Sequence, residues 1–376
     1  MRSAIHRSGW RWLLCIGSAL TLLAGPTHTA QASKAGGSLP PEFFGVLPYV
    51  TPSSAEFSHM RAGGVGAARI AFCQCEVEKA QGTYNWYYYD RIVGRAARSG
   101  VSVAPVLLGV PAWMSPQLVR MPIDSPAQEA SWSAFVAAAA ERYGPGGTFW
   151  SANPGVAAQP IVHWEVWNEP NISGWVAGPP SARRYARLLR ITHAALRAGN
   201  PATRTMVAGL YRRPAEGKGP PMNVFLSRLY RVKGVKNWFD AVGVHPYGTS
   251  SRQVLKVVRK AREVMDANQD RRATIWVTEI GWTTGGDQWA QSLYRATPEE
   301  QARRLARSYR SLIRERRRLR LRQITWHGWR DWDGPRPVEF VGWLWQMGVF
   351  TSAGQPKPAW EALTRIAGGV PTGPIP

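Results

Sequence analysis

The segment "IVHWEVWNEPN", residues 161–171, places an apolar, strand-like run directly before a turn that carries an amide and a carboxylate. Pro170 has no backbone N–H to donate to a neighbouring strand. We therefore expect the regular strand to end no later than Glu169. A similar run, "IWVTEIGW" at residues 275–282, contains Glu279 near its end. We therefore expect two buried strands that each present a glutamate at the carboxyl end.

Short apolar runs alternate with longer amphipathic ones through the rest of the chain, which predicts parallel strands joined by helices. The expected strands are residues 43–49, 67–72, 101–108, 161–167, 205–210, 241–245, 274–278 and 323–327. Helical patterns lie near residues 53–63, 86–99, 127–143, 181–198, 221–232, 252–267, 298–318 and 358–366. This alternation favours a single closed (β/α)8 TIM barrel of the α/β class. An open doubly wound sheet is the alternative, although its glycine fingerprint is absent after the first strand.

The start of the chain has the pattern of a secretory signal peptide. Three arginines precede an apolar stretch at residues 12–24, and small residues follow it. An uncleaved membrane anchor is the alternative, but this stretch is short for a bilayer. The expected boundaries are a signal peptide at 1–32, a linker at 33–41, one barrel domain at 42–368 and a tail at 369–376. We expect a secreted monomer that meets a membrane only through its signal peptide.

The chain is strongly basic. Its formal charge of +23 becomes +20 without residues 1–32, which hold three arginines and no acid. An arginine-rich segment, residues 303–322, repeats arginine at helical spacing at positions Arg303, Arg307, Arg310, Arg314 and Arg317. This spacing predicts a surface helix whose basic face either stays solvated or binds an anionic partner such as an acidic glycan. No zinc-finger spacing or P-loop accompanies it, so we expect no nucleic-acid partner.

Cys73 and Cys75 are the cysteines that remain after the predicted signal peptide. In an oxidising compartment they could form a disulfide or remain as two thiols. A pair at this spacing is not by itself a metal site. We expect neither a metal nor an organic cofactor.

The two glutamates suggest the chemistry. The active site of such a barrel forms at the carboxyl ends of its strands, where Glu169 and Glu279 would meet. Cleavage of a glycosidic bond requires two carboxyl groups, one to protonate the leaving oxygen and one to attack or stabilise the anomeric carbon. Arg69 and Tyr247 could keep one carboxylate ionised, while a less polar environment keeps the other protonated. The alternative is that each glutamate simply pairs with an arginine, and that His245 is a core histidine.

Several motifs together resemble clan A glycoside hydrolases. They are "WNEP" at 167–170, "TEIGW" at 278–282, Arg69, "HPY" at 245–247, "GTYNW" at 82–86 and "KPAW" at 357–360. Within that clan the chain is most similar to the β-xylosidase and α-iduronidase family and to bacterial cellulase-like relatives. The resemblance covers residues 43–366.

The resemblance implies roles for individual residues. Glu169 would be the general acid/base, with Asn168 donating a hydrogen bond to the 2-hydroxyl of the sugar. Glu279 would be the nucleophile, oriented by Arg69 and Tyr247, and His245 would support the site. It implies a carbohydrate substrate and retention of the anomeric configuration. The rival is an exported glycan-binding or adhesion protein on a non-catalytic barrel.

Tryptophan is abundant, with 19 in the chain. Indole rings stack on the apolar faces of sugars but also fill protein cores. The ones that we expect in the cleft are Trp113, Trp167, Trp282 and Trp326, with Trp329 as the alternative to Trp326.

Four further positions need an interpretation. Gln74 stands where relatives commonly carry a tryptophan, which puts the usual contacts to the first sugar in doubt. We interpret Glu165 as a charge inside the barrel that pairs with an arginine. Asp331 and Asp333 are expected to be solvated loop acids rather than sugar ligands.

Overall fold

The computed structural model describes residues 39–286, 292–334 and 342–376. The expected signal peptide and residues 33–38 of the expected linker lie outside these ranges, so both stay predictions. None of the helices in the described part is both long and apolar enough to span a bilayer.

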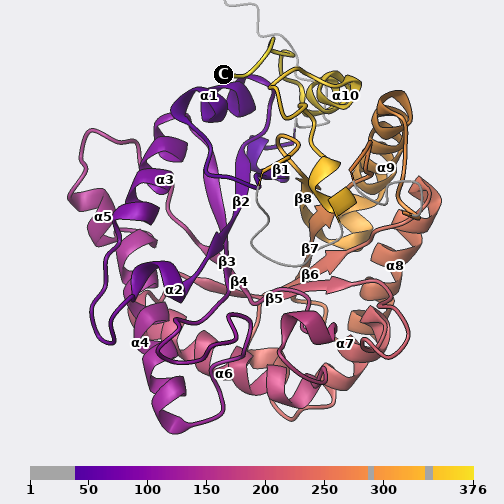
Figure 1. Cartoon of the computed structure of the whole chain (residues 1–376). Coiled ribbons are helices and arrows are strands. Elements are labelled where there is room, and N and C mark those ends of the chain that lie inside the picture. The colour runs from indigo at the N-terminus through magenta and orange to yellow at the C-terminus, as the bar shows by residue number, and fades with distance from the viewer. Residues whose placement is uncertain (1–38, 287–291, 335–341) are drawn as a thin grey trace, which may run out of the picture. The chain divides into compact units, whose positions relative to one another are not determined.

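Parallel strands pair in chain order and close into a barrel (Figure 1). Closure is made by the first and last strands, where Phe44 is opposite Ile324 and Leu47 is opposite His327. The strands are β1 (Phe44–Leu47), β2 (Ala67–Phe72), β3 (Ser102–Leu107), β4 (His163–Val166), β5 (Arg204–Tyr211), β6 (Ala241–His245), β7 (Thr274–Ile280) and β8 (Leu321–His327). The predicted (β/α)8 fold is confirmed, and the alternative, an open doubly wound sheet, is excluded.

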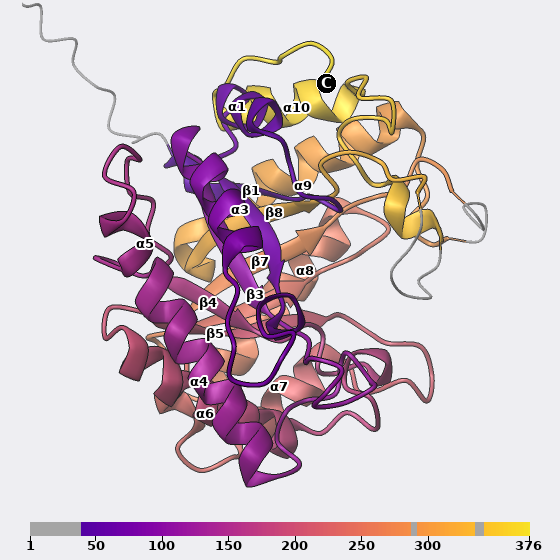
Figure 2. The same cartoon turned by 60° about the vertical axis from the view of Figure 1, so that its left-hand side comes forward.

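Helices surround the barrel, as Figures 1 and 2 show from two sides. Those that match the sequence expectation are α1 (Ser54–Ala62), α3 (Tyr87–Arg98), α4 (Pro126–Tyr143), α6 (Ala182–Gly199), α7 (Met222–Tyr230), α8 (Ser251–Ala267), α9 (Pro298–Leu319) and α10 (Pro358–Ala367). Shorter elements that the sequence did not reveal are α2 (Gln74–Val77), α5 (Thr148–Ser151), η1 (Pro41–Phe43), η2 (Ser173–Trp175), η3 (Val235–Asn237) and η5 (Gly342–Gln346).

Side-chain caps fix where several of the helices begin. A hydroxyl accepts a hydrogen bond from the third helical N–H at Ser53, Ser125, Ser181, Ser250 and Thr297. Ser53 and Thr297 belong to full capping boxes, in which Glu56 and Glu300 return the bond. These caps set the length of the strand-to-helix loops at the mouth of the barrel.

The ends of the described chain pack against the barrel. Val370 donates its backbone N–H to Ala62 at 2.8 Å, and Ile375, which is buried, donates to Gly354 at 2.9 Å. Residues 369–376, the predicted C-terminal tail, are thus fastened to the rest of the chain by backbone hydrogen bonds. Helices α1 and α10 lie side by side (Figure 2). They approach so closely that a side chain at Gly63, which follows α1, would collide with Trp360 on α10.

Candidate active site

The turn after β4 has an unusual backbone. Trp167 and Glu169 have positive φ angles of 72° and 40°, a region that non-glycine residues rarely adopt. The turn is held in place because the N–H of Glu169 donates to the carbonyl of Gly209 on β5 at 3.2 Å. Backbone strain of this kind is typical of functional sites.

Asn171 anchors the same turn from its other end. Its side-chain amide donates to the carbonyls of Tyr211 at 2.8 Å and Pro220 at 3.0 Å. Its side-chain oxygen accepts from the N–H of Tyr211 at 3.0 Å. The last residue of "WNEPN" thus ties the turn to the end of β5 and fixes the position of Glu169.

Glu279 lies near the end of β7 and accepts two strong hydrogen bonds. Its Oε1 atom accepts from Nη1 of Arg69 at 2.7 Å, and its Oε2 atom accepts from the hydroxyl of Tyr247 at 2.9 Å. The expected contact of an arginine and a tyrosine with one carboxylate is confirmed. Because Arg69 is always charged, it favours the ionised form of Glu279.

Arg69 is itself held by two further side chains. Glu165 receives bonds from its Nε and Nη2 atoms at 2.8 and 3.0 Å, so the predicted pairing of Glu165 with an arginine is confirmed. Asn168 accepts from Nη2 at 2.9 Å through its side-chain oxygen. Since that oxygen must face the guanidinium, the amide nitrogen of Asn168 points elsewhere and can donate to a ligand.

His245 lies between the two glutamates. Its Nδ1 atom is 2.7 Å from Oε1 of Glu169 and 3.5 Å from Oε2 of Glu279. One ligand atom from each of these three residues lies within 4.8 Å of the others, a spacing that could in principle suit a metal ion. In the described structure, however, the oxygens of Glu279 already accept from Arg69 and Tyr247, as expected for an acid–base site.

The two glutamates have opposite pKa shifts. Burial raises the pKa of Glu169, and this effect outweighs the opposing hydrogen bond with His245. Burial also acts to raise the pKa of Glu279, but electrostatic interactions with His245, His327 and Arg69 and the hydrogen bond from Tyr247 lower it to about 2. Burial thus favours the protonated form of Glu169, whereas Glu279 is ionised at neutral pH.

His327, at the end of β8, is a site residue that the sequence reasoning missed. Its Nε2 atom lies 3.7 Å from Oε2 of Glu279, and its Nδ1 atom is 3.1 Å from the hydroxyl of Tyr49. Tyr49 gives its only proton to the carbonyl of Leu344 at 2.8 Å, so Nδ1 of His327 must donate to Tyr49. Burial lowers the pKa of His327 to about 4, which leaves an unprotonated Nε2 facing the site. The signal in the sequence that could have identified His327 is its position at the end of the last predicted strand.

Gly209 on β5 is a second residue that the sequence reasoning missed. Its N–H donates to Oε1 of Glu165 at 2.7 Å, while its carbonyl accepts from Glu169. A methyl group at this position would lie 1.9 Å from Nε2 of His245. Only glycine leaves room for the imidazole of His245. A glycine inside a predicted strand is the sequence signal that could have indicated such close packing.

Most of the expected cleft tryptophans are buried, which corrects that expectation. Trp167, Trp282 and Trp326 are each 0% exposed, and Trp329 is 1% exposed. The indole N–H of Trp282 donates to Gly248 and that of Trp326 to Met347, both at 2.8 Å, and the N–H of Trp167 donates to Trp175 at 2.5 Å. Because backbone carbonyls of the loops satisfy these groups, the rings lie beneath the loops as part of the core.

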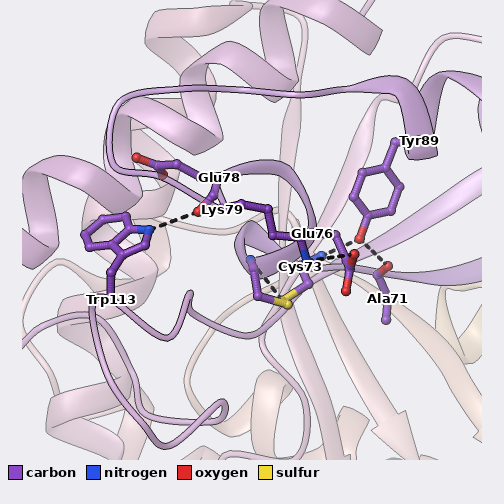
Figure 3. Close-up of a disulfide and its surroundings, with 8 residues drawn as sticks. Ala71, Cys73, Glu76, Glu78, Lys79, Tyr89 and Trp113 are labelled. Carbon is purple, nitrogen blue, oxygen red and sulfur yellow. Dashed lines mark hydrogen bonds and ion pairs between the residues drawn. A yellow bond between two sulfur atoms is a disulfide. The ribbon is translucent and has the colours of Figure 1, made fainter.

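Trp113 differs, because it is 37% exposed and could reach a ligand. Its indole N–H donates to the carbonyl of Glu78 at 2.9 Å. In Figure 3, Glu78 and Lys79 lie between Trp113 and Cys73.

Cys73 and Cys75 are joined by a disulfide. This finding settles the choice between bonded and free thiols for the described structure.

Gln74, between the two cysteines, is buried rather than open to a ligand. Its amide donates to Glu78 at 2.6 Å and to Ser131 at 2.9 Å. The residue that replaces the relatives' tryptophan therefore braces the loop after β2.

The acids after β8 have different environments. Asp331 is buried, forms an ion pair with Lys357 at 2.5 Å and accepts the N–H of Gly348 at 2.8 Å. The expectation of a solvated loop acid is therefore wrong for Asp331, which joins the loop to the start of α10. Asp333 is exposed, as expected, and accepts from Gln346 at 2.6 Å.

Solved structures with a similar fold are glycoside hydrolases. A family 39 glycoside hydrolase from Bacteroides cellulosilyticus is 19% identical, with a TM-score of 0.63 over 88% of this chain and 64% of that one. A monomeric β-xylosidase from Caulobacter crescentus is 19% identical, with a TM-score of 0.63 over 87% and 68%. The GH53 catalytic domain from Ignisphaera aggregans is 15% identical, with a TM-score of 0.60 over 88% and 97%. This chain thus spans less than two thirds of the first of these proteins, and at such identities the likeness establishes the fold.

Sequence comparison finds a match for part of the chain. No curated protein sequence matches the chain. Residues 129–310 match the family described as glycosyl hydrolase catalytic core, and this range contains both Glu169 and Glu279. On a closed parallel barrel, residues 129–310 are thus similar to the catalytic core of glycosyl hydrolases.

Proposed function

We propose that the protein is a secreted enzyme that hydrolyses O-glycosidic bonds of a poly- or oligosaccharide with retention of configuration. The observation that carries this proposal is the pair of glutamates at the mouth, whose carboxylate oxygens approach within 4.8 Å and whose pKa values shift in opposite directions. Retaining enzymes place their two carboxyl groups about 5 Å apart, whereas inverting enzymes leave room for a water molecule between them.

In the first step, Glu279 attacks the anomeric carbon while Glu169 gives its proton to the leaving oxygen. The low pKa of Glu279 supports its role as the nucleophile, and the raised pKa of Glu169 supports its role as the acid. The products of this step are the released alcohol and a glycosyl ester on Glu279. Asn168, whose side-chain oxygen is occupied by Arg69, would donate its amide to the sugar's 2-hydroxyl.

In the second step, Glu169 acts as a base. It takes a proton from a water molecule, which attacks the anomeric carbon and releases Glu279 as a carboxylate. Two inversions at the same carbon give net retention. Arg69 and Tyr247 stabilise the negative charge that returns to Glu279.

The substrate is a carbohydrate, and β-xylosides are the first compounds to test because a structurally similar protein is a β-xylosidase. A screen of plant and cell-wall polysaccharides and aryl glycosides, followed by NMR of the first product anomer, tests the proposal. We expect the product to have the configuration of the substrate. Inversion, or binding without turnover by the unaltered protein, would contradict it.

The cellular location and oligomeric state are also part of the proposal. The apolar stretch at residues 12–24 supports cleavage near residue 32 and export. Expression of the full chain in a bacterial host, with N-terminal sequencing of the exported protein, checks this. Gel filtration of the mature protein checks the expected monomer.

A further inference from the structure

The outer face of α9 carries a stripe of exposed arginines. These are Arg303, Arg307, Arg310, Arg314 and Arg317, which we call the α9 stripe. The helix lies on the outside of the barrel between α8 and α10 (Figure 1). The stripe therefore faces solvent, away from the two glutamates at the mouth.

The α9 stripe lacks the close ion pairs of its neighbours, although Arg303 and Arg314 interact electrostatically with Glu299 and Glu315. On the same helix, Arg304 pairs with Glu300 and Arg318 with Glu315. Across the described residues, by contrast, no arginine of the stripe forms an ion pair with a carboxylate. Its positive charge is therefore available to a ligand.

The stripe ends in a hollow at the base of the barrel. This basal pocket has a volume of about 310 Å³ and lies at the first residues of β7 and β8, the opposite end from the glutamates. Its lining is Leu39, Pro40, Phe43, Thr274, Arg316, Arg317, Arg320, Leu321 and Arg322. Arg317 belongs to both features, so stripe and pocket form one continuous basic surface.

The pocket combines two kinds of lining. Leu39 and Pro40 offer apolar surface that suits the C–H face of a sugar ring, above the nearly buried Phe43 and Leu321. The four arginines of the lining form no ion pair with a carboxylate in the described part of the chain. Guanidinium groups bind carboxylates through two parallel hydrogen bonds, so the lining suits a sugar that carries a carboxylate.

The spacing of the stripe indicates a linear ligand. At 1.5 Å per residue the stripe is about 21 Å long, with successive arginines about 5 Å apart along the axis. This interval is on the order of the repeat of one sugar in an extended polysaccharide. A polymer with one carboxylate on each sugar could therefore meet several arginines in turn.

We propose that the α9 stripe and the basal pocket bind a linear uronic-acid polysaccharide outside the catalytic centre. Single-stranded nucleic acid needs aromatic platforms for its bases, and the described side chains of α9 include no exposed aromatic ring. A lipid surface is favoured by apolar side chains that insert beside the charges, and the stripe has none. The proposal does not depend on the reaction at the mouth.

Binding to polygalacturonate, measured by affinity electrophoresis and calorimetry at several salt concentrations, tests the proposal. The Glu279→Gln protein is used, so that the polymer stays intact. In this background, Arg310→Gln/Arg314→Gln/Arg317→Gln should weaken binding by roughly tenfold or more and reduce its salt dependence, because fewer counterions are released. With Glu279 intact, the triple variant should keep the activity of the parent on a small aryl glycoside.

A matched control removes the same charge elsewhere. Arg98→Gln/Arg183→Gln/Arg190→Gln replaces exposed arginines on α3 and α6 that form no ion pair within the described structure. This control should bind polygalacturonate like its parent. Equal losses in both triple variants, no loss in the stripe variant, or tighter binding to phosphatidylserine vesicles or single-stranded DNA would overturn the proposal.

Discussion

Glu169 and Glu279 are the same amino acid at the same end of one barrel, yet their surroundings differ. Both are 8% exposed, so burial alone does not distinguish them. Glu279 accepts bonds from Arg69 and Tyr247, whereas the side chain of Glu169 has His245 at 2.7 Å. A permanent cation and a phenol keep one carboxylate ionised, and without them burial favours the acid.

The comparison shows how the barrel assigns two roles to one residue type. The partners of Glu279 come from β2 and from the loop after β6, while Glu169 lies in a turn that Gly209 and Asn171 fasten to β5. Different strands therefore supply the main hydrogen-bond partners of each glutamate, while His245 lies near both. A change to the partners of one glutamate should alter the pKa of that glutamate most.

The largest effect is expected from Glu279→Gln. The amide cannot form the glycosyl ester, so kcat should fall roughly 10⁴-fold or more for every substrate. Steady-state kinetics with substrates of good and poor leaving groups measures this. Sugar binding, followed by calorimetry, should persist. An activity close to that of the unaltered enzyme would remove Glu279 from the mechanism.

Glu169→Gln should have a smaller and selective effect. Loss of the proton donor should slow the hydrolysis of glycosides with poor leaving groups by about 10²- to 10⁴-fold. The leaving group of a dinitrophenyl glycoside departs without protonation. The rate at which the variant forms the glycosyl ester from this substrate should therefore be nearly unchanged. A pre-steady-state burst of dinitrophenol would measure that rate. Equal losses for both leaving groups would mean that Glu169 is not the acid.

Tyr247→Phe removes one hydrogen bond to Glu279. We expect a fall in kcat of about 10- to 100-fold, the usual range for a bond to a charged group. The pKa of Glu279 should rise, so activity should be lost at a higher pH on the acid side. Tyr230→Phe is the matched control, because Tyr230 donates to the carboxylate of Asp270 at 2.8 Å and lies outside the site. An unchanged profile in Tyr247→Phe would contradict the assignment.

The smallest effect is a shift in the pH profile of the unaltered enzyme. Glu169 must be protonated, which holds below its pKa, and burial raises that pKa. Activity should therefore persist above the pH at which an ordinary glutamic acid ionises and fall as pH rises further. In Glu169→Gln, assayed with the activated substrate, this basic limb should disappear. Its persistence would assign the limb to another group.

The barrel was predictable because its signal is periodic. Apolar strands and amphipathic helices alternate along the whole chain, so small errors at element ends did not change the topology. The glutamates followed from the same logic, since strand ends meet at one face of a barrel. Arg69 was predicted from its place near the end of the second strand, and Glu165 was predicted to pair with an arginine, though not with Arg69 in particular.

The surroundings of the site were less predictable. His327 depends on a hydrogen bond to Tyr49, 278 residues away, and Gly209 on the room that His245 requires. The burial of Trp282 and Trp326 depends on loop carbonyls that cover them. Long-range contacts of this kind leave no regular pattern in a single sequence.

The most direct test of the account is to identify the residue that carries the glycosyl ester. The enzyme is treated with an activated 2-deoxy-2-fluoro glycoside of the sugar that it hydrolyses, and its peptides are analysed by mass spectrometry. We predict one added sugar on the peptide that contains Glu279, and none in Glu279→Gln. An adduct on Glu169, or rapid turnover with inversion and no adduct, would contradict the assignment of Glu279 as the nucleophile.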